Sequence, residues 1–179
     1  MQSDFNFRLM KCEFWLRDRF HPPGEILRNA GVASNMTVLD FGCGPGGFSL
    51  AAAQLVQPEG RVYAVDIHPL ALQGIKNIAR KNKLHHLQSL HSRQLGELKK
   101  QSVDMVLLYD ILHDVEEPLS VLRRLHELLA PAGKVSVKDH RLNEEQIVGL
   151  VTKEGLFEPG DRQTHTLQFK PLPPCGGHS

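Results

Sequence analysis

The feature that most constrains this 179-residue chain is a glycine turn between an apolar run and an alanine-rich segment. Residues 36–42 read MTVLDFG, which is typical of a short buried strand, and they lead directly into CGPGG. Residues 48–56, FSLAAAQLV, are rich in helix formers. Glycines permit positive φ and close backbone approach, and the following helix directs free N–H groups over the turn. The sequence therefore predicts a strand, a ligand-binding turn and a helix.

The alternation of strands and helices continues along the chain. Further strands are expected at 61–67, 86–92, from 102 onward and at 134–139, with helices at 25–30, 69–82, 117–130 and 144–155. Five strands alternating with helices predict an α/β fold with a parallel sheet. Two last strands, about 157–162 and 164–170, are expected to pair antiparallel, and residues 131–133 should form a turn.

The length predicts one domain. We expect this domain to span 1–170, with N-terminal helices in about 1–31 over the active site and a flexible tail at 171–179. The 21 Lys and Arg nearly balance the 20 Asp and Glu, which argues against nucleic acid as a partner and favours a small molecule. The sequence leaves a homodimer open.

The cellular location is predicted from cysteines and the N-terminus. The three cysteines are far apart and odd in number, so a disulfide framework is not expected. Charges at Asp4, Arg8 and Lys11 interrupt the apolar residues of the N-terminus, which argues against a signal peptide or membrane insertion. We therefore expect a cytoplasmic protein.

The glycine turn also matches a nucleotide-binding fingerprint. Gly42, Gly44 and Gly47 fit G-x-G-x-x-G, and Asp66 ends the next strand at about the ~20-residue distance that the fingerprint requires. A carboxylate at Asp66 can accept hydrogen bonds from both hydroxyls of an unphosphorylated ribose. The combination predicts a cofactor that contains adenosine.

Asp40 distinguishes between the adenosine cofactors. Its carboxylate immediately precedes the turn, where a dinucleotide would place its doubly negative pyrophosphate. S-adenosylmethionine carries no phosphate and brings a positive amino group and a sulfonium, so an acidic residue here becomes favourable, directly or through a water. Asp40 therefore favours S-adenosylmethionine over NAD.

These residues resemble a known family. The string VLDFGCGPGGFS is similar to the first motif of class I S-adenosylmethionine-dependent methyltransferases, D/E-x-G-x-G-x-G, with its fixed places at Asp40, Gly42, Gly44 and Gly46. The resemblance extends to VYAVDIHP, YDILHDVEEP and LHELLAPAGKVSVKD, and it covers about 24–170. Within the family the chain is most similar to the small-molecule group typified by ubiquinone and menaquinone methyltransferases.

The resemblance implies a fold, a cofactor and a binding site. It implies a Rossmann-like, doubly wound, seven-stranded sheet of order 3-2-1-4-5-7-6 with strand 7 antiparallel, and direct in-line transfer of a methyl group to a small-molecule acceptor. The residues that would hold S-adenosylmethionine are Asp40, Gly42, Cys43, Gly44, Gly46, Asp66, Ile67, Ser92, Arg93 and Tyr109.

The chain departs from the family in two places. After the third strand, HSRQLGEL lacks the usual acidic residue, so Ser92, Arg93 or Gln94 would have to contact the adenine. Only HRLN separates strand five from the last helix, where many members insert a lid. The N-terminal helices or a second subunit would then have to close the pocket, unless it stays open.

Polar residues at the carboxyl ends of strands four and five are the acceptor-side candidates. We take His113, Asp139 and His140 as catalytic candidates, beside Tyr109 and Asp110. Each also has a structural interpretation, such as helix capping or packing, and the same interpretation applies to Asp114 and Glu116 before the next helix. Asp104 begins strand four at the opposite end, so a structural role is expected there.

No metal ion is expected, because His85, His86, His91 and His126 show no recognised ligand spacing. Two other functions stay open. An NAD-dependent oxidoreductase would share the glycine turn but would not favour a carboxylate at Asp40. A non-catalytic protein that binds S-adenosylmethionine would share the whole cofactor site.

Overall fold

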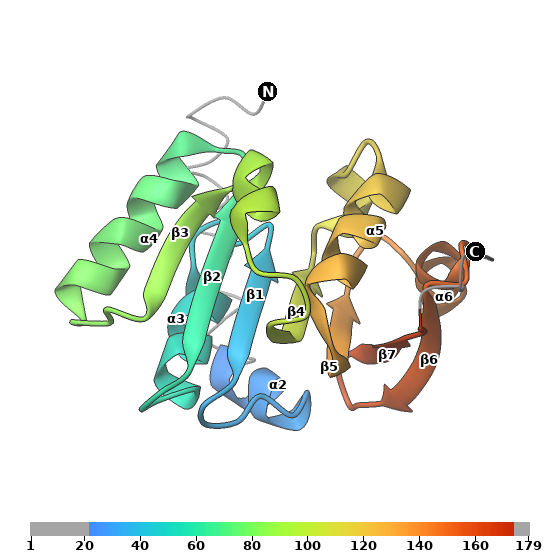
Figure 1. Cartoon of the computed structure of the whole chain (residues 1–179), viewed down its shortest axis with the longest axis horizontal. Coiled ribbons are helices and arrows are strands. Elements are labelled where there is room, and N and C mark those ends of the chain that lie inside the picture. The colour runs from blue at the N-terminus through green and yellow to red at the C-terminus, as the bar shows by residue number, and fades with distance from the viewer. Residues whose placement is uncertain (1–21, 174–179) are drawn as a thin grey trace.

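The computed structural model describes residues 22–173, which form a seven-stranded sheet with helices on both faces (Figure 1). The strands are β1 Thr37–Phe41, β2 Arg61–Asp66, β3 Leu87–His91, β4 Val103–Tyr109, β5 Leu129–Lys138, β6 Phe157–Arg162 and β7 Leu167–Pro171. The helices are α2 Pro23–Asn29, α3 Gly47–Leu55, α4 Pro69–Lys81, α5 Pro118–Leu128 and α6 Glu144–Thr152, with 3-10 turns η1 Ser92–Glu97 and η2 Leu112–Asp114.

The sheet has the predicted strand order. Its strands lie in the order β3-β2-β1-β4-β5-β7-β6. The first five are parallel, and β7 runs antiparallel to both β5 and β6. The carboxyl ends of β1 to β5 therefore meet at one edge, where open α/β sheets bind their ligands.

Two apolar clusters, one on each face, hold the sheet between its helices. One joins residues of α2, α3 and α4, among them Leu27, Ala52 and Ile75, to the sheet. The other joins α5 and α6 to the opposite face, with Leu125 and Ile147 as members. The central strands are apolar on both faces because each face is covered, which explains their continuous apolar sequence.

Several element boundaries differ from those expected. Strand β5 begins at Leu129, and the turn expected at 131–133 lies inside it, where its partner on β4 shifts from Val103 to Met105. The residues from 130 to 133 bulge out of the pairing. The N-cap of α5 is Glu117, without a side-chain capping bond, so neither Asp114 nor Glu116 caps this helix, and only a role through their charge near its start is left for them.

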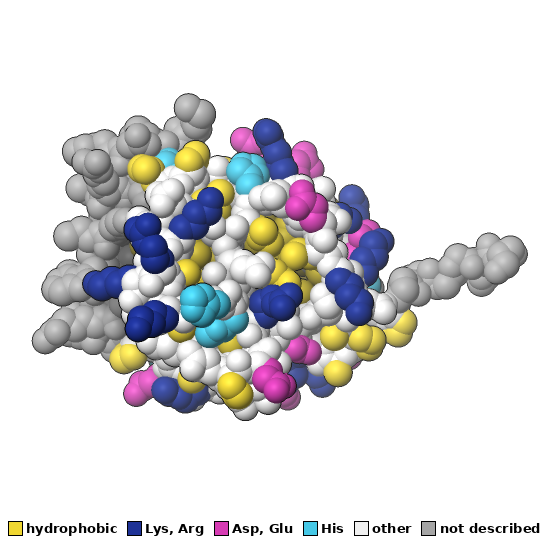
Figure 2. Space-filling model, turned by 60° about the vertical axis from the view of Figure 1, so that its left-hand side comes forward, with side chains coloured by type: hydrophobic (Ala, Val, Ile, Leu, Met, Phe, Trp, Pro, Cys, Tyr) yellow, Lys and Arg dark blue, Asp and Glu magenta, His cyan; other side chains and the backbone are white. Residues whose placement is uncertain are grey.

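Cations gather along one edge of the sheet. The segment 67–96 contains no Asp or Glu, and its Lys and Arg residues are Lys76, Arg80, Lys81, Lys83 and Arg93, all of them exposed. Figure 2, which turns this side of the molecule forward, shows Lys and Arg side chains gathered on it. The net charge of the whole chain is close to zero, but positive charge is in excess on the surface beside β3. Such charges also keep an edge strand from pairing with another sheet.

Some expectations concern residues that the structure does not describe. The N-terminal helical pattern before residue 22 and the tail from 174 onward lie outside the described residues. At the C-terminal end of the described residues, β7 continues to Pro171, and Leu172 donates its N–H to the carbonyl of Leu156. Among residues 22–173, no helix is long and apolar enough to cross a membrane.

Candidate active site

The glycine turn is a tight loop fixed against β2. Gly42, Gly44 and Gly46 all have positive φ, of 78°, 48° and 89°. The N–H groups of Gly42 and Cys43 donate to the carbonyl of Val65, at 2.8 and 3.0 Å. A Cβ on Gly42 would lie 2.4 Å from a side-chain carbon of Ile111, so glycine is required here by both φ and space. The turn thus brings the N-terminus of α3 to the ligand edge.

Asp66 ties the end of β2 to this turn. One carboxylate oxygen accepts the N–H of Gly44 at 2.9 Å, and the other accepts the N–H of His68 at 2.8 Å. Each oxygen keeps a further lone pair for a ligand. The next residue, Ile67, has 71% of its surface exposed, which leaves an apolar side chain open beside the carboxylate.

Asp40 is buried directly below the turn. Its residue is only 3% exposed, and Ser49 donates its hydroxyl hydrogen to the carboxylate at 2.5 Å. Burial raises the pKa of Asp40 to about 6; the Ser49 hydrogen bond opposes this shift and the charge of Asp66 adds to it. The ionised form of Asp40 is therefore disfavoured, and a nearby cation would stabilise it.

Two expected cofactor residues point into the protein. Tyr109 is buried, its hydroxyl lies 2.8 Å from the Ser136 oxygen, and its ring meets Phe48 edge-on. Burial raises the pKa of the phenol, so Tyr109 stays neutral. Burial likewise raises the pKa of Cys43 far above its ordinary value, so its thiol is not a nucleophile. The side chains of these two residues therefore belong to the protein interior.

Ser92 and Arg93 begin η1, immediately after β3 and next to the end of β2. A capping box holds this turn: the ring of His91 accepts the N–H of Arg93, and the side chain of Gln94 accepts the N–H of His91, both at 3.1 Å. No sequence signal marks this cap, because histidine is an uncommon N-cap residue.

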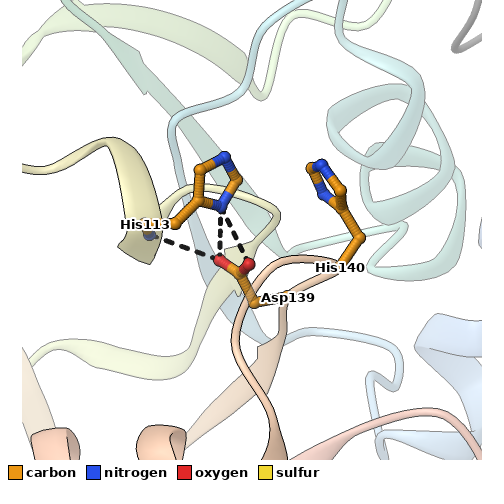
Figure 3. A group of neighbouring side chains, drawn as sticks. All are labelled: His113, Asp139 and His140. Atoms are coloured by element: carbon orange, nitrogen blue, oxygen red, sulfur yellow. Dashed lines mark hydrogen bonds and ion pairs between the residues drawn. The ribbon is translucent and has the colours of Figure 1, made fainter.

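His113 and Asp139 form a hydrogen-bonded pair across the ends of β4 and β5 (Figure 3). Nδ1 of His113 lies 2.8 and 2.9 Å from the two carboxylate oxygens of Asp139. The carboxylate also accepts the N–H groups of Arg141 and Leu142 at 2.9 and 3.2 Å, and its side chain has no exposed surface. It is therefore a positioning residue that fixes the ring of His113.

The charge state of Asp139 supports this role. Burial would raise the pKa of its carboxyl, but the N–H of Arg141 and the ring of His113 outweigh burial and hold the pKa below its ordinary value. An ionised carboxylate can only accept, so Nδ1 of His113 must donate. The other ring nitrogen, Nε2, is directed away from Asp139 in Figure 3 and lies 3.5 Å from a carboxylate oxygen of Asp114.

A second pair, His140 and Asp110, lies beside the first. Nδ1 of His140 is 3.2 Å from a carboxylate oxygen of Asp110, and its ring meets that of His113 with centroids 4.9 Å apart at 82°. Asp110 has φ of +55°, and its N–H donates to the carbonyl of Lys138 at 2.7 Å. The sequence placed Asp110 at this edge but did not predict its partner.

A hollow of about 240 Å³ adjoins Asp139 on the α6 side of the sheet. It lies between the end of β5, the start of α6 and the β6–β7 turn, and Arg162 crosses from β6 to pair with Glu144 of α6 at 3.0 Å. Its walls are Val137, Lys138, Asp139, Leu142, Glu144, Ile147 and residues 162–167. The β6–β7 turn thus supplies a wall that no sequence motif indicates.

Other polar candidates have structural roles. Asp104 accepts the N–H of Thr37 at 2.8 Å at the opposite end of the sheet, which confirms the structural role predicted for it. His86 and His126 each place Nε2 2.7 Å from a backbone carbonyl oxygen, of Ala53 and Leu172.

Comparison with known sequences identifies the family. A profile described as a methyltransferase domain matches residues 33–169. The chain is 26% identical to a demethylmenaquinone methyltransferase of Geobacillus stearothermophilus, over 61% of this chain and 47% of that protein. It is 27% identical to a ubiquinone biosynthesis O-methyltransferase of Aliivibrio fischeri, over 89% of this chain and 71% of that protein. The chain thus spans about half the length of the first relative.

The same fold occurs among solved structures. A SAM-dependent methyltransferase from Aquifex aeolicus superimposes with a TM-score of 0.74, covering 87% of this chain and 91% of that one, at 22% sequence identity. At 22% identity this structural similarity supports the fold alone. The assignment to the family rests on the sequence profile that matches residues 33–169.

Proposed function

The chain belongs to the methyltransferase domain family, whose methyl donor is S-adenosylmethionine, and we propose that it transfers the methyl group directly to a small-molecule acceptor. The observation that carries the choice of donor is the buried Asp40 below the glycine turn. Its raised pKa means that its charge lacks compensation within the protein. A ligand with a positive amino group and a sulfonium supplies that compensation, whereas a pyrophosphate would add to the repulsion.

The residues around the turn fit this donor. We assign the ribose hydroxyls to the free lone pairs of Asp66 and one face of the adenine to the exposed Ile67. The methionine part would lie over Gly42, Gly44 and Gly46, close to the backbone of Cys43 and Tyr109, and Ser92 and Arg93 would border the adenine edge. The close packing of Gly42 against Ile111 keeps this loop low enough for a ligand to lie on it.

When bound, the donor supplies an electrophilic methyl group on sulfur, which an acceptor atom attacks in line. We assign the acceptor end to His113 and His140, since both lie at the carboxyl ends of β4 and β5. Asp139 holds His113 with Nε2 as the proton-accepting atom, so His113 can remove a proton from an acceptor hydroxyl. The O-methyltransferase among the relatives supports an oxygen acceptor.

The hollow next to this end of the sheet is of a size that suits a small acceptor. The hollow beside Asp139 measures about 240 Å³ and has apolar and polar walls, so it could hold a compact ring with a few polar groups. Both relatives named above are enzymes of quinone biosynthesis by their names, which also supports a small organic acceptor.

Titration calorimetry of the full chain with S-adenosylmethionine, S-adenosylhomocysteine and NADH tests the donor. We expect micromolar binding of the first two and no signal from NADH. Binding of NADH alone would overturn the proposal.

A screen of phenolic and other hydroxyl acceptors then tests transfer. His113→Gln should reduce the rate while leaving donor affinity unchanged, because the hydrogen bonds and ion pairs of His113 go to Asp139 and Asp114 and not to the glycine turn. Tight donor binding with no methylated product from any acceptor would instead indicate a binding protein without enzymatic activity.

A further inference from the structure

The cations beside β3 differ from those in the rest of the protein. The segment 67–96 has five Lys and Arg and no Asp or Glu, whereas the segment 97–173 has ten Lys and Arg and thirteen Asp and Glu. In that second segment six cations pair with carboxylates, namely Lys100, Arg123, Arg124, Lys134, Arg141 and Arg162. None of the five cations in 67–96 forms an ion pair with another described residue. Positive charge without a counter-charge therefore gathers on this side of the molecule (Figure 2).

Most of this charge lies on helix α4 and the turn after it. Lys76 and Arg80 are four positions apart on α4, and Lys81 and Lys83 follow at its end. Like charges at such spacings repel one another, and the segment has no acidic residue to offset them. The dipole of α4 favours cations in its last turn but not Lys76 in its middle. β3 itself carries no Lys or Arg, so protection of the sheet edge does not by itself explain their number.

We propose that this surface, made by Lys76, Arg80, Lys81, Lys83 and Arg93, holds the protein reversibly against an anionic lipid membrane. Clusters of four to eight Lys and Arg on one helical surface bind anionic headgroups through their summed charge. The protein has no carboxylate on this segment to repel such a surface. This inference rests on the charge pattern and does not depend on the proposed methyl transfer.

Exposed apolar side chains favour a lipid surface over nucleic acid. Among residues 22–173, the large apolar side chains that are exposed are those of Ile67 and Leu70, at the N-terminal end of α4. An apolar side chain beside cations can enter the boundary between headgroups and acyl chains. Single-stranded nucleic acids are held largely by stacking on aromatic side chains, and the segment 67–96 contains no Phe, Tyr or Trp.

Attachment through this surface would orient the ligand edge of the sheet. Asp66 ends β2 and pairs with His91 at the end of β3, so Ile67 and Arg93 follow at the carboxyl ends of neighbouring strands. The carboxyl edge would then lie close to the headgroups, within reach of molecules that the membrane carries. Leu70 has no part in the proposed donor site, so it can be changed without disturbing that site.

The test measures sedimentation of the full chain with vesicles of phosphatidylcholine alone and of equal parts phosphatidylcholine and phosphatidylglycerol. We expect binding to the anionic vesicles alone, and its loss at about 1 M salt, where the screening length falls to about 3 Å. Lys76→Gln together with Lys83→Gln should weaken binding about 25-fold, since each cation near an anionic surface contributes about fivefold. Leu70→Ser should weaken it further, because an apolar contact is lost.

Lys153→Gln together with Lys170→Gln is the matched control, because both lysines are exposed, lie outside the surface and remove the same charge. This control should bind the anionic vesicles almost as well as the unmodified chain. Equal losses in the two double variants, or no binding of the unmodified chain to anionic vesicles, would overturn the proposal. Binding to duplex RNA in fluorescence anisotropy, without binding to vesicles, would assign the surface to nucleic acid instead. No methyl donor is present, so each of these failures leaves the proposed methyl transfer untouched.

Discussion

Replacement of Asp40 by asparagine should stabilise the free protein and weaken its binding of the methyl donor. Asparagine keeps the size and shape of the side chain and removes its charge. The pKa of Asp40 is about 6 against an ordinary 3.8, which at 1.36 kcal/mol per pKa unit corresponds to on the order of 3 kcal/mol. This is the destabilisation caused by the buried charge above pH 6, and it sets the upper limit of the gain expected from Asp40→Asn.

The dependence on pH has a definite sign. A carboxyl whose pKa is raised in the folded state binds more protons when folded than when unfolded between the two pKa values. Its contribution therefore favours folding below about pH 4 and is lost as the pH rises through about 6. The stability difference between Asp40→Asn and the unmodified chain should accordingly grow from pH 4 to pH 7.

Urea unfolding at pH 5 and pH 8 measures this difference, and calorimetry measures donor affinity at pH 8. We expect the variant to gain about 1–3 kcal/mol at pH 8 and to bind S-adenosylmethionine about tenfold more weakly. Ser49→Ala is the control, because it removes the hydrogen bond that stabilises the ionised form and should lower stability at pH 8. An Asp40→Asn variant that is less stable at pH 8, or that binds the donor with unchanged affinity, would refute the reasoning.

Three other substitutions separate binding from stability. Asp66→Ala should weaken S-adenosylmethionine binding by roughly 1–3 kcal/mol in calorimetry, because the ribose hydroxyls lose their acceptors; unchanged affinity would contradict the assignment. Gly42→Ala should lower the free energy of unfolding by about 2–4 kcal/mol, since it combines positive φ with a collision against Ile111, and Ile111→Ala in the same chain should recover part of this loss in urea unfolding. Asp104→Ala should cost about 1–3 kcal/mol of stability by leaving the N–H of Thr37 without its acceptor, and calorimetry should find donor affinity unchanged, since both residues lie at the far end of the sheet.

The helices and strands were largely predictable because their signals are local, whereas the order of the strands was inferred from the family resemblance. Apolar runs, glycines and prolines mark each strand and helix, and the strands expected at 61–67 and 157–162 agree closely with β2 and β6. The predicted boundaries are wrong where the pairing of two strands outweighs the local preference of the sequence. The segment Pro131 to Gly133 has turn chemistry, yet it forms a bulge within β5, because Leu129 pairs with Val103 before the ladder resumes at Lys134.

The shape of the glycine turn was predictable for a related reason. Asp40 and the glycines of the turn are contiguous in sequence, so their spacing alone places a carboxylate below a loop with positive φ. The sequence did not predict how Asp66 is used within the free protein. Its carboxylate accepts N–H groups on both sides, from Gly44 and His68, and so ties the turn to β2 as well as facing the ligand edge.

By itself, the sequence indicated the cofactor of this protein, because a glycine turn with acidic residues beside it suits a cationic cofactor that contains adenosine. Only the tertiary structure showed how the polar residues at the ends of β4 and β5 pair. His113 and Asp139 are 26 positions apart, and Asp110 and His140 are 30 apart. They meet because Tyr109 pairs with Lys138 across β4 and β5. A register between two strands depends on the packing of the whole sheet, which no local pattern records.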